Sequence, residues 1–177
     1  LDGTPLVASA MGIVVIAIAV KAGVFPVHTW LPRTYPGTSA AVMGLFSGLH
    51  TKVAVYMLYR IWVHIFDMDP TWNWLIVAFM VVSMLVGGFA GLGENSIRRV
   101  LAYQMVNGMP FILIMMAFTS DDPQRALAAG LLYTLHHMIT IAALVLTSGA
   151  IEETYGTGML SKLSGLARRE PVVAAVF

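Results

Sequence analysis

Basic side chains stand in the middle of apolar stretches at three places along this sequence of 177 residues. Lys21 interrupts VVIAIAVKAGVFPV, Lys52 interrupts GLHTKVAVYML, and the adjacent His136 and His137 interrupt LLYTLHHMIT. A lysine removed from water can exchange its proton near neutral pH, and histidine does so even in water. The chemistry that these residues predict is therefore the binding and release of protons.

The polar groups near Lys52 occupy different sides of the predicted helix. Tyr56 follows Lys52 by four residues, so the two share a face and the phenol can hydrogen-bond to the ammonium. His50 lies two residues before Lys52 and therefore points to a different side. Gly44 and Gly48 are four residues apart, a small-xxx-small pattern that predicts close packing against another helix.

The two adjacent histidines have hydroxyl groups on either side at helical spacing. Tyr133 precedes His137 by four residues, and Thr140 follows His136 by four. This pattern favours a proton-transfer site over an isolated core histidine. Asn107, near the middle of another apolar run, leaves two interpretations open: an interhelical hydrogen bond, or a member of the same polar layer.

Membrane-spanning helices must position these groups. The sequence is 58% hydrophobic and 11% charged, with a mean hydropathy of +0.81, whereas a soluble domain carries roughly a quarter charged residues. Helices are the expected spanning elements, because a bilayer offers no partner to an unpaired backbone amide. The predicted fold is an all-α, polytopic transmembrane bundle with spans at about 5–32, 39–65, 72–92, 96–119, 124–151 and from 171–177 onward.

The first span should be interrupted. Pro26 removes a backbone donor and clashes with the preceding turn, so the helix over 5–32 should kink or break there, with Lys21 close to its middle. A short surface helix is expected over 158–167. Because the sixth span has barely begun at the last residue, we expect 1–177 to be an internal fragment of one longer membrane domain.

Lysine and arginine residues near the helix ends predict the orientation. Six of eight fall on one side, which places the connections after the first, third and fifth spans in the cytoplasm. The six are Arg33, Arg98, Arg99, Lys162, Arg168 and Arg169, and the two on the other side are Arg60 and Arg125. Glu152 and Glu153, at the cytoplasmic end of the fifth span, are expected to lie in water.

No cofactor, metal or nucleic acid is expected. His50 and His64 are fourteen residues apart, which resembles the spacing of haem ligands in membrane cytochromes, but the adjacent histidine pair cannot supply matching ligands from a facing helix. No His, Asp and Glu cluster has the spacing of a zinc site. The sequence has no cysteine, which excludes Cys-ligated clusters within it.

A row of bases at one depth, bridged by water, tyrosine and threonine, would let protons move sideways within a membrane. The segments KAGVFPVHTWLPRTYPGTSAAVMGLFSGLHTKVAVYMLYRI, RRVLAYQMVNG and LLYTLHHM resemble the antiporter-like membrane subunits shared by Mrp-type Na+/H+ antiporters and respiratory complex I. FPVHTWLPRTYPG, LHTKVAVY and the tail GAIEETYGTGMLSKLSGLARREP look most like the D-type branch of the Mrp antiporter subunits.

The resemblance implies a proton-translocating subunit of a multi-subunit Na+/H+ antiporter in the bacterial inner membrane, a transporter and not an enzyme. Its implied partners are the other antiporter subunits, the lipid bilayer, protons and Na+. Ile141 stands where the family commonly has a lysine, so the relay beyond the histidines is either interrupted or carried by Thr140 and water. Two alternatives are a proton-pumping subunit of complex I or a membrane-bound hydrogenase, and a structural scaffold. The residues to which the resemblance assigns proton transfer are Lys21, Lys52, His136 and His137.

Overall fold

The computed structural model describes residues 5–176, and these are almost entirely helical. Five helices are long and apolar enough to cross a membrane, as the sequence predicts. Between residues 5 and 176 the extended backbone pairing is limited to one isolated bridge, Ser96 with Met159. The predicted all-α membrane bundle is therefore confirmed.

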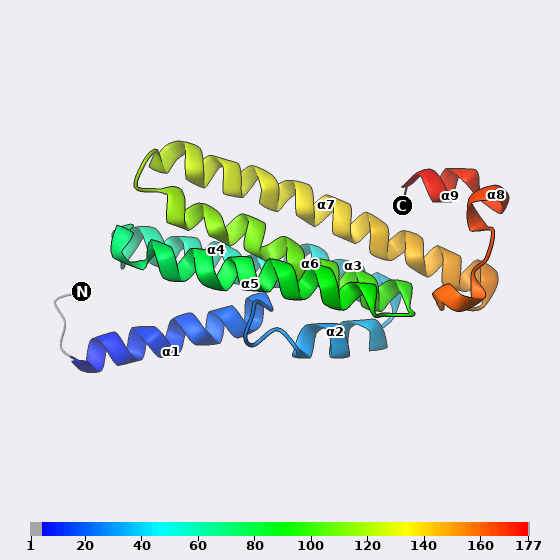
Figure 1. Ribbon diagram of the computed structural model, residues 1–177, viewed down its shortest axis with the longest axis horizontal. Coiled ribbons are helices and arrows are strands. Elements are labelled where there is room, and N and C mark those ends of the chain that lie inside the picture. The colour runs from blue at the N-terminus through cyan, green and yellow to red at the C-terminus, as the bar shows by residue number, and fades with distance from the viewer. Residues whose placement is uncertain (1–4, 177) are drawn as a thin grey trace.

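The long helices lie lengthwise beside one another (Figure 1). They are α1 (Pro5–Ala22), α5 (Asn73–Leu92), α6 (Ile97–Leu113) and α7 (Pro123–Tyr155), with a composite helix of α3 (Ala40–Leu45), the π-helical η2 (Phe46–His50) and α4 (Thr51–His64). The short segments are α2 (Trp30–Thr34), η1 (Tyr35–Gly37), η3 (Pro70–Trp72), η4 (Ile114–Phe118), η5 (Leu160–Lys162), α8 (Leu166–Arg169) and α9 (Pro171–Val176). Helices α1 and α2 run along one side of the bundle and α7 along the other. The end where α6 begins and α7 ends is called the Arg98 end below.

Helix α1 ends at Ala22 in a Schellman motif. Gly23 takes the left-handed conformation there, with φ +72°. The Gly23 amide donates to the Val20 carbonyl at 3.1 Å, and the Val24 amide donates to the Ala19 carbonyl at 3.4 Å. These two bonds satisfy carbonyls that a helix end leaves without partners.

The predicted break of the first span is confirmed, but the helix stops before the proline that predicted it. An irregular segment, 23–29, contains Pro26 and separates α1 from α2. The expected span over 5–32 is therefore a helix of 18 residues followed by non-helical backbone.

The other helix bounds differ little from the prediction. The composite helix covers 40–64, α5 with η3 covers 70–92, α6 with η4 covers 97–118, and α7 covers 123–155. The expected surface helix over 158–167 is wrong. That stretch contains η5 and the start of α8, separated by irregular backbone in which Gly165 is left-handed.

The buried hydroxyl of Ser83 anchors the irregular segment 23–29 to α5 and α6. The Phe25 amide donates to this hydroxyl at 3.1 Å, and the hydroxyl donates to the Val106 carbonyl at 3.3 Å. The α-helical partner of that carbonyl would be the amide of residue 110, but Pro110 has none. One side chain thus satisfies two backbone groups that lack a partner in their own elements.

Close helix packing at the predicted glycine pair is confirmed. A Cβ on Gly44 would lie 3.5 Å from Leu146, and one on Gly48 would lie 3.6 Å from the Met138 carbonyl. Both neighbours belong to α7, so α3 and η2 lie directly against that helix. This packing brings the helix of Lys52 beside the helix of the two histidines.

Candidate proton-transfer site

Lys21 lies in the last turn of α1, one residue before the helix ends. The Trp30 indole donates to the Val20 carbonyl at 2.7 Å and so covers part of this terminus. The C-terminal end of a helix carries a partial negative charge, which favours a cation. Lys21, expected close to the middle of the interrupted span 5–32, therefore lies at the end of its helix.

Lys52 is buried where the composite helix changes from π to α geometry. Its side chain is 5% exposed, and its ammonium donates to the Ser47 carbonyl, within η2, at 2.6 Å. The predicted hydrogen bond between Tyr56 and Lys52 is not formed among the described residues, and Tyr56 is 56% exposed. The π turn supplies the acceptor that the sequence prediction assigned to the phenol.

His137 points into the bundle and His136 points outward. The His137 ring is buried against α6 at Gly108, where a side-chain Cβ would overlap the ring nitrogen Nε2. His136 is exposed. The Tyr133 ring contacts both, with centroid distances of 5.7 Å to His136 and 6.2 Å to His137. Gly48, four residues before Lys52, packs against the backbone of Met138, the residue after His137, so the structure brings the helices of these two predicted residues together.

Two of the predicted supporting residues make no hydrogen bond to this pair within residues 5–176. Thr140 is exposed on α7. Asn107 donates to the Gln104 side chain of its own helix at 3.4 Å, and its backbone packs so closely on Gly87 that a Cβ there would lie 2.8 Å from the Asn107 Cα. Within residues 5–176 no group of three or more His, Cys, Asp or Glu side chains could hold a metal ion.

Three of the five buried polar atoms that have no hydrogen-bond partner in the described part of the chain lie on the elements around Lys52. They are Ser47 Oγ, Thr51 Oγ1 and His137 Nδ1. Element η2 packs against α7, so these atoms belong to facing helices. Folded proteins leave few buried polar atoms without a protein or water partner. The region therefore offers the polar partners that an ordered water molecule requires.

A second pair of polar side chains, Tyr35 and His50, lies near the end of α1. The sequence prediction included His50 but missed Tyr35. The Tyr35 hydroxyl lies 3.2 Å from His50 Nδ1. The Trp30 ring packs edge-on against Tyr35 at a centroid distance of 5.6 Å, and its indole donates to the Val20 carbonyl beside Lys21. Tyr35 is 3% exposed although it lies outside the long helices. Nothing in the sequence singled out Tyr35, because its hydrogen-bond partner His50 is fifteen residues away on another element.

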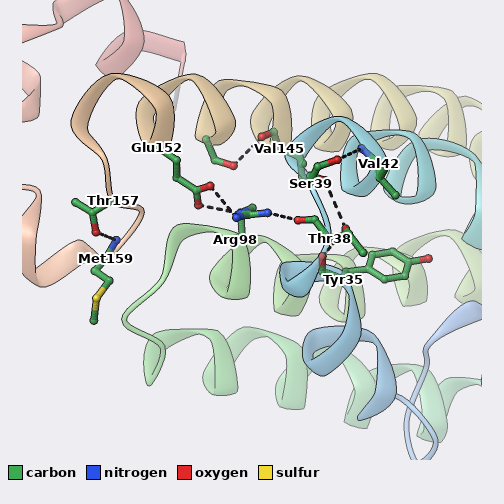
Figure 2. A network of polar contacts seen from close by, with 10 residues as sticks. Tyr35, Thr38, Ser39, Val42, Arg98, Val145, Glu152, Thr157 and Met159 are labelled. Carbon is green, nitrogen blue, oxygen red and sulfur yellow. Dashed lines mark hydrogen bonds and ion pairs between the residues drawn. The ribbon is translucent and has the colours of Figure 1, made fainter.

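An ion pair holds the backbone turn that follows Tyr35. Arg98 and Glu152 form two contacts of 2.8 Å each, Nε with Oε1 and Nη2 with Oε2, and Nη1 donates to the Thr38 carbonyl. Figure 2 shows Arg98 between Glu152 and Thr38. The expectation that Glu152 lies in water as a free helix-end charge is wrong, since its side chain is 21% exposed and paired.

Comparison with known proteins identifies the family. Residues 2–177 match the family described as NADH:quinone oxidoreductase/Mrp antiporter, TM. The chain belongs to this family. It is 32% identical over 166 residues to the D subunit of the Na(+)/H(+) antiporter of Alkalihalophilus pseudofirmus, covering 93% of this chain and 33% of the relative. It is 34% identical over 177 residues to the N subunit of the NADH-quinone oxidoreductase of Saccharopolyspora erythraea, covering 97% of this chain and 33% of the relative.

A solved structure of the Mrp complex from Dietzia sp. contains a chain that is 47% identical, with a TM-score of 0.89. The match covers 98% of this chain and 32% of that one. The resemblance found in the sequence is thus confirmed. The chain spans about a third of the length of the curated relatives it matches.

Ile141, four residues after His137, lies on the buried face of α7. Ile141 is buried in an apolar cluster that includes Leu31, Tyr35 and Met43. The buried face of α7 is therefore apolar immediately beyond His137.

Proposed function

We propose that this chain is the proton-translocating part of a subunit of a multi-subunit Na+/H+ antiporter, in which Lys21, Lys52, His136 and His137 exchange protons through water within the membrane. The observation that carries the proposal is the pair formed by Lys52 and His137. Both are buried, their helices pack together at Gly48 and Met138, and hydroxyl groups without partners in the described residues lie on the helix of Lys52. Similarity to the D subunit of an Na(+)/H(+) antiporter and to a chain of an Mrp complex supports antiport as the process.

The proposal extends to partners and location. The partners are the other subunits of a hetero-oligomeric complex, the lipid bilayer, protons and Na+, and the chain performs no enzymatic step of its own. The location is a bacterial inner membrane, with the Arg98 end in the cytoplasm. The orientation can be tested with a membrane-impermeant thiol reagent, because the chain has no cysteine. In whole cells the reagent should modify Ser120→Cys and spare Ser164→Cys, and the reverse pattern would overturn the orientation.

The test of function is Na+-driven proton exchange in everted vesicles that contain the complete complex. Lys21→Ala should abolish exchange while the complex still assembles, because Lys21 is the basic residue in the last turn of α1. Lys162→Ala, which removes an exposed lysine in η5, is the matched control and should behave as the wild type. Wild-type exchange by the Lys21 variant would overturn the relay and leave a scaffold as the function.

A redox-driven proton pump is the second candidate, because the chain is 34% identical to a subunit of an NADH-quinone oxidoreductase. The same vesicles decide between the two. An antiporter exchanges protons for Na+ without any electron donor, whereas a redox-driven pump requires one.

A further inference from the structure

Tyr35 and His50 are held together at a fixed distance between the Arg98 end and Lys21. The hydroxyl of Tyr35 lies 3.2 Å from His50 Nδ1. Phe46 packs against both rings, with centroid distances of 6.1 Å to Tyr35 and 5.5 Å to His50. This three-ring contact keeps the imidazole beside the phenol.

The same imidazole lies near the end of α1. Trp30, whose ring packs against Tyr35 at a centroid distance of 5.6 Å, donates to the Val20 carbonyl next to Lys21. No hydrogen bond to the second ring nitrogen of His50 occurs among residues 5–176, so Nε2 is available to a water molecule. His50 therefore has a phenol on one nitrogen and a free nitrogen for exchange with Lys21 through water.

The backbone of Tyr35 is fixed from three helices. Thr38 donates to the Tyr35 carbonyl through both its hydroxyl, at 2.8 Å, and its amide, at 3.1 Å. The Thr38 carbonyl accepts from Arg98 of α6, which is paired with Glu152 of α7. The next residue, Ser39, caps α3 by accepting from the Val42 amide at 3.3 Å. In Figure 2 the Tyr35 ring extends from this network away from Arg98.

We propose that Tyr35 and His50 form a proton-carrying pair that connects Lys21 with the Arg98 end, and that Arg98 and Glu152 are positioning residues for Tyr35. The inference rests on the proposed function and adds a route into or out of the relay. The phenol and the imidazole each both donate and accept a hydrogen bond, which such a route requires.

The transfer balances without any other reactant. A proton released by Lys21 reaches His50 Nε2 through water, and the Nδ1 proton passes to the Tyr35 oxygen while the phenol releases its own proton to water on the far side. One proton enters and one leaves. Burial raises the pKa of Tyr35 to about 12, so the phenol stays protonated between transfers and holds no charge.

The experiment compares exchange rates of assembled complexes in everted vesicles. Tyr35→Phe keeps the ring and removes the hydroxyl, and His50→Gln keeps hydrogen bonding without a titratable group. Both should lower Na+-driven proton exchange by roughly tenfold or more. Tyr103→Phe is the control, because that hydroxyl makes no hydrogen bond in the described residues, and it should keep the wild-type rate.

Positioning by the ion pair is tested with a double variant. Glu152→Gln should lower the rate alone but cause no additional loss when combined with Tyr35→Phe, because both act on the same hydroxyl. A purely structural role for Glu152 predicts losses that multiply, and that result would overturn the positioning role.

Lys21→Ala separates the two proposals. If it abolishes exchange while Tyr35→Phe and His50→Gln exchange at the wild-type rate, the pair is not on the route and the proposed function stands. If Lys21→Ala exchanges normally, the proposed function itself fails. If the Tyr35→Phe complex does not assemble, the exchange rate of His50→Gln decides whether the pair is on the route, because His50 is partly exposed and its replacement disturbs the fold less.

Discussion

Gly108 allows the His137 ring to approach α6, and replacing it by alanine tests whether that approach matters. The added Cβ would lie 2.5 Å from His137 Cδ2 and 3.3 Å from Cε1, and it would overlap Nε2. Nonbonded carbon atoms have their optimum at about 3.5–4.0 Å. The ring must therefore retreat by about 1 Å or more.

Gly108→Ala should change the rate of proton exchange more strongly than the stability of the complex against unfolding. A misplacement of about 1 Å in a reacting group costs up to roughly a hundredfold in rate. Overpacking costs about 1–3 kcal/mol of stability, while alanine in place of glycine within a helix returns about 0.5–1 kcal/mol. We expect Gly108→Ala to lower the rate of proton exchange by roughly ten- to a hundredfold. The midpoint of thermal unfolding of the complex should fall only slightly, because the overpacking cost is partly offset by the gain in helix propensity.

The assay is Na+-driven proton exchange in vesicles, normalised to the amount of assembled complex. Gly88→Ala on α5 is the matched control, because a Cβ there meets nothing within 4 Å. It should keep the wild-type rate. Wild-type exchange by a normally assembled Gly108→Ala complex would refute the reasoning, since it would mean that the position of the His137 ring does not limit transfer.

Three further variants test how the fold is held. Gly23→Ala places a Cβ 2.6 Å from Leu31 Cδ1 at a left-handed residue, so unfolding of the detergent-purified complex should require about 1–2 kcal/mol less. Ser83→Ala leaves a buried amide and a buried carbonyl without their shared partner, which should cost about 1–3 kcal/mol in the same measurement. Hydrogen bonds from Thr71 hold the pKa of Asp69 below its ordinary value, so its contact with the Thr71 amide persists above the pKa of the unfolded chain and is lost as the pH falls through the lower folded pKa. Amide exchange at Thr71 should accordingly lose protection in acid in the wild type and not in Asp69→Asn.

Matched controls exist for the two stability variants. Gly12→Ala adds a Cβ where nothing lies within 4 Å. Ser9→Ala removes an exposed hydroxyl that bonds only to its own helix, at the Pro5 carbonyl. If the controls lowered the unfolding midpoint as much as Gly23→Ala and Ser83→Ala do, the packing and hydrogen-bond arguments would be wrong. For Asp69, equal acid sensitivity of the wild type and Asp69→Asn would contradict the capping argument.

The spans could be predicted because bilayer thickness sets their length and lipid requires them to be apolar. Helix ends obey other rules. Helix α7 continues to Tyr155, beyond the predicted 151. The polar residues after 151 can extend the helix outside the membrane, where the thickness of the bilayer sets no limit. Helix α1 stops at Ala22, where Lys21, Gly23 and Pro26 are ordinary stop signals that the sequence prediction did not use to end the span. The apolar residues after Gly23 concealed them, because they belong to the irregular segment and not to the helix.

The arrangement of the site could be predicted only within single helices. Helical spacing gives the contact of Tyr133 with His137, but the π turn that supplies the acceptor of Lys52 has no signature in FSGLH. Arg98 and Glu152 are 54 residues apart and meet because two helices end at the same level. Each charge alone had the appearance of a solvated helix end.

The terminus of α1 brings a counter-charge of a particular kind to Lys21. A carboxylate beside a lysine compensates its charge but can also accept the proton that the lysine gives up. The peptide dipoles at a helix end compensate charge without being protonated. The end of α1 thus stabilises a cation at Lys21 without adding a second site for its proton.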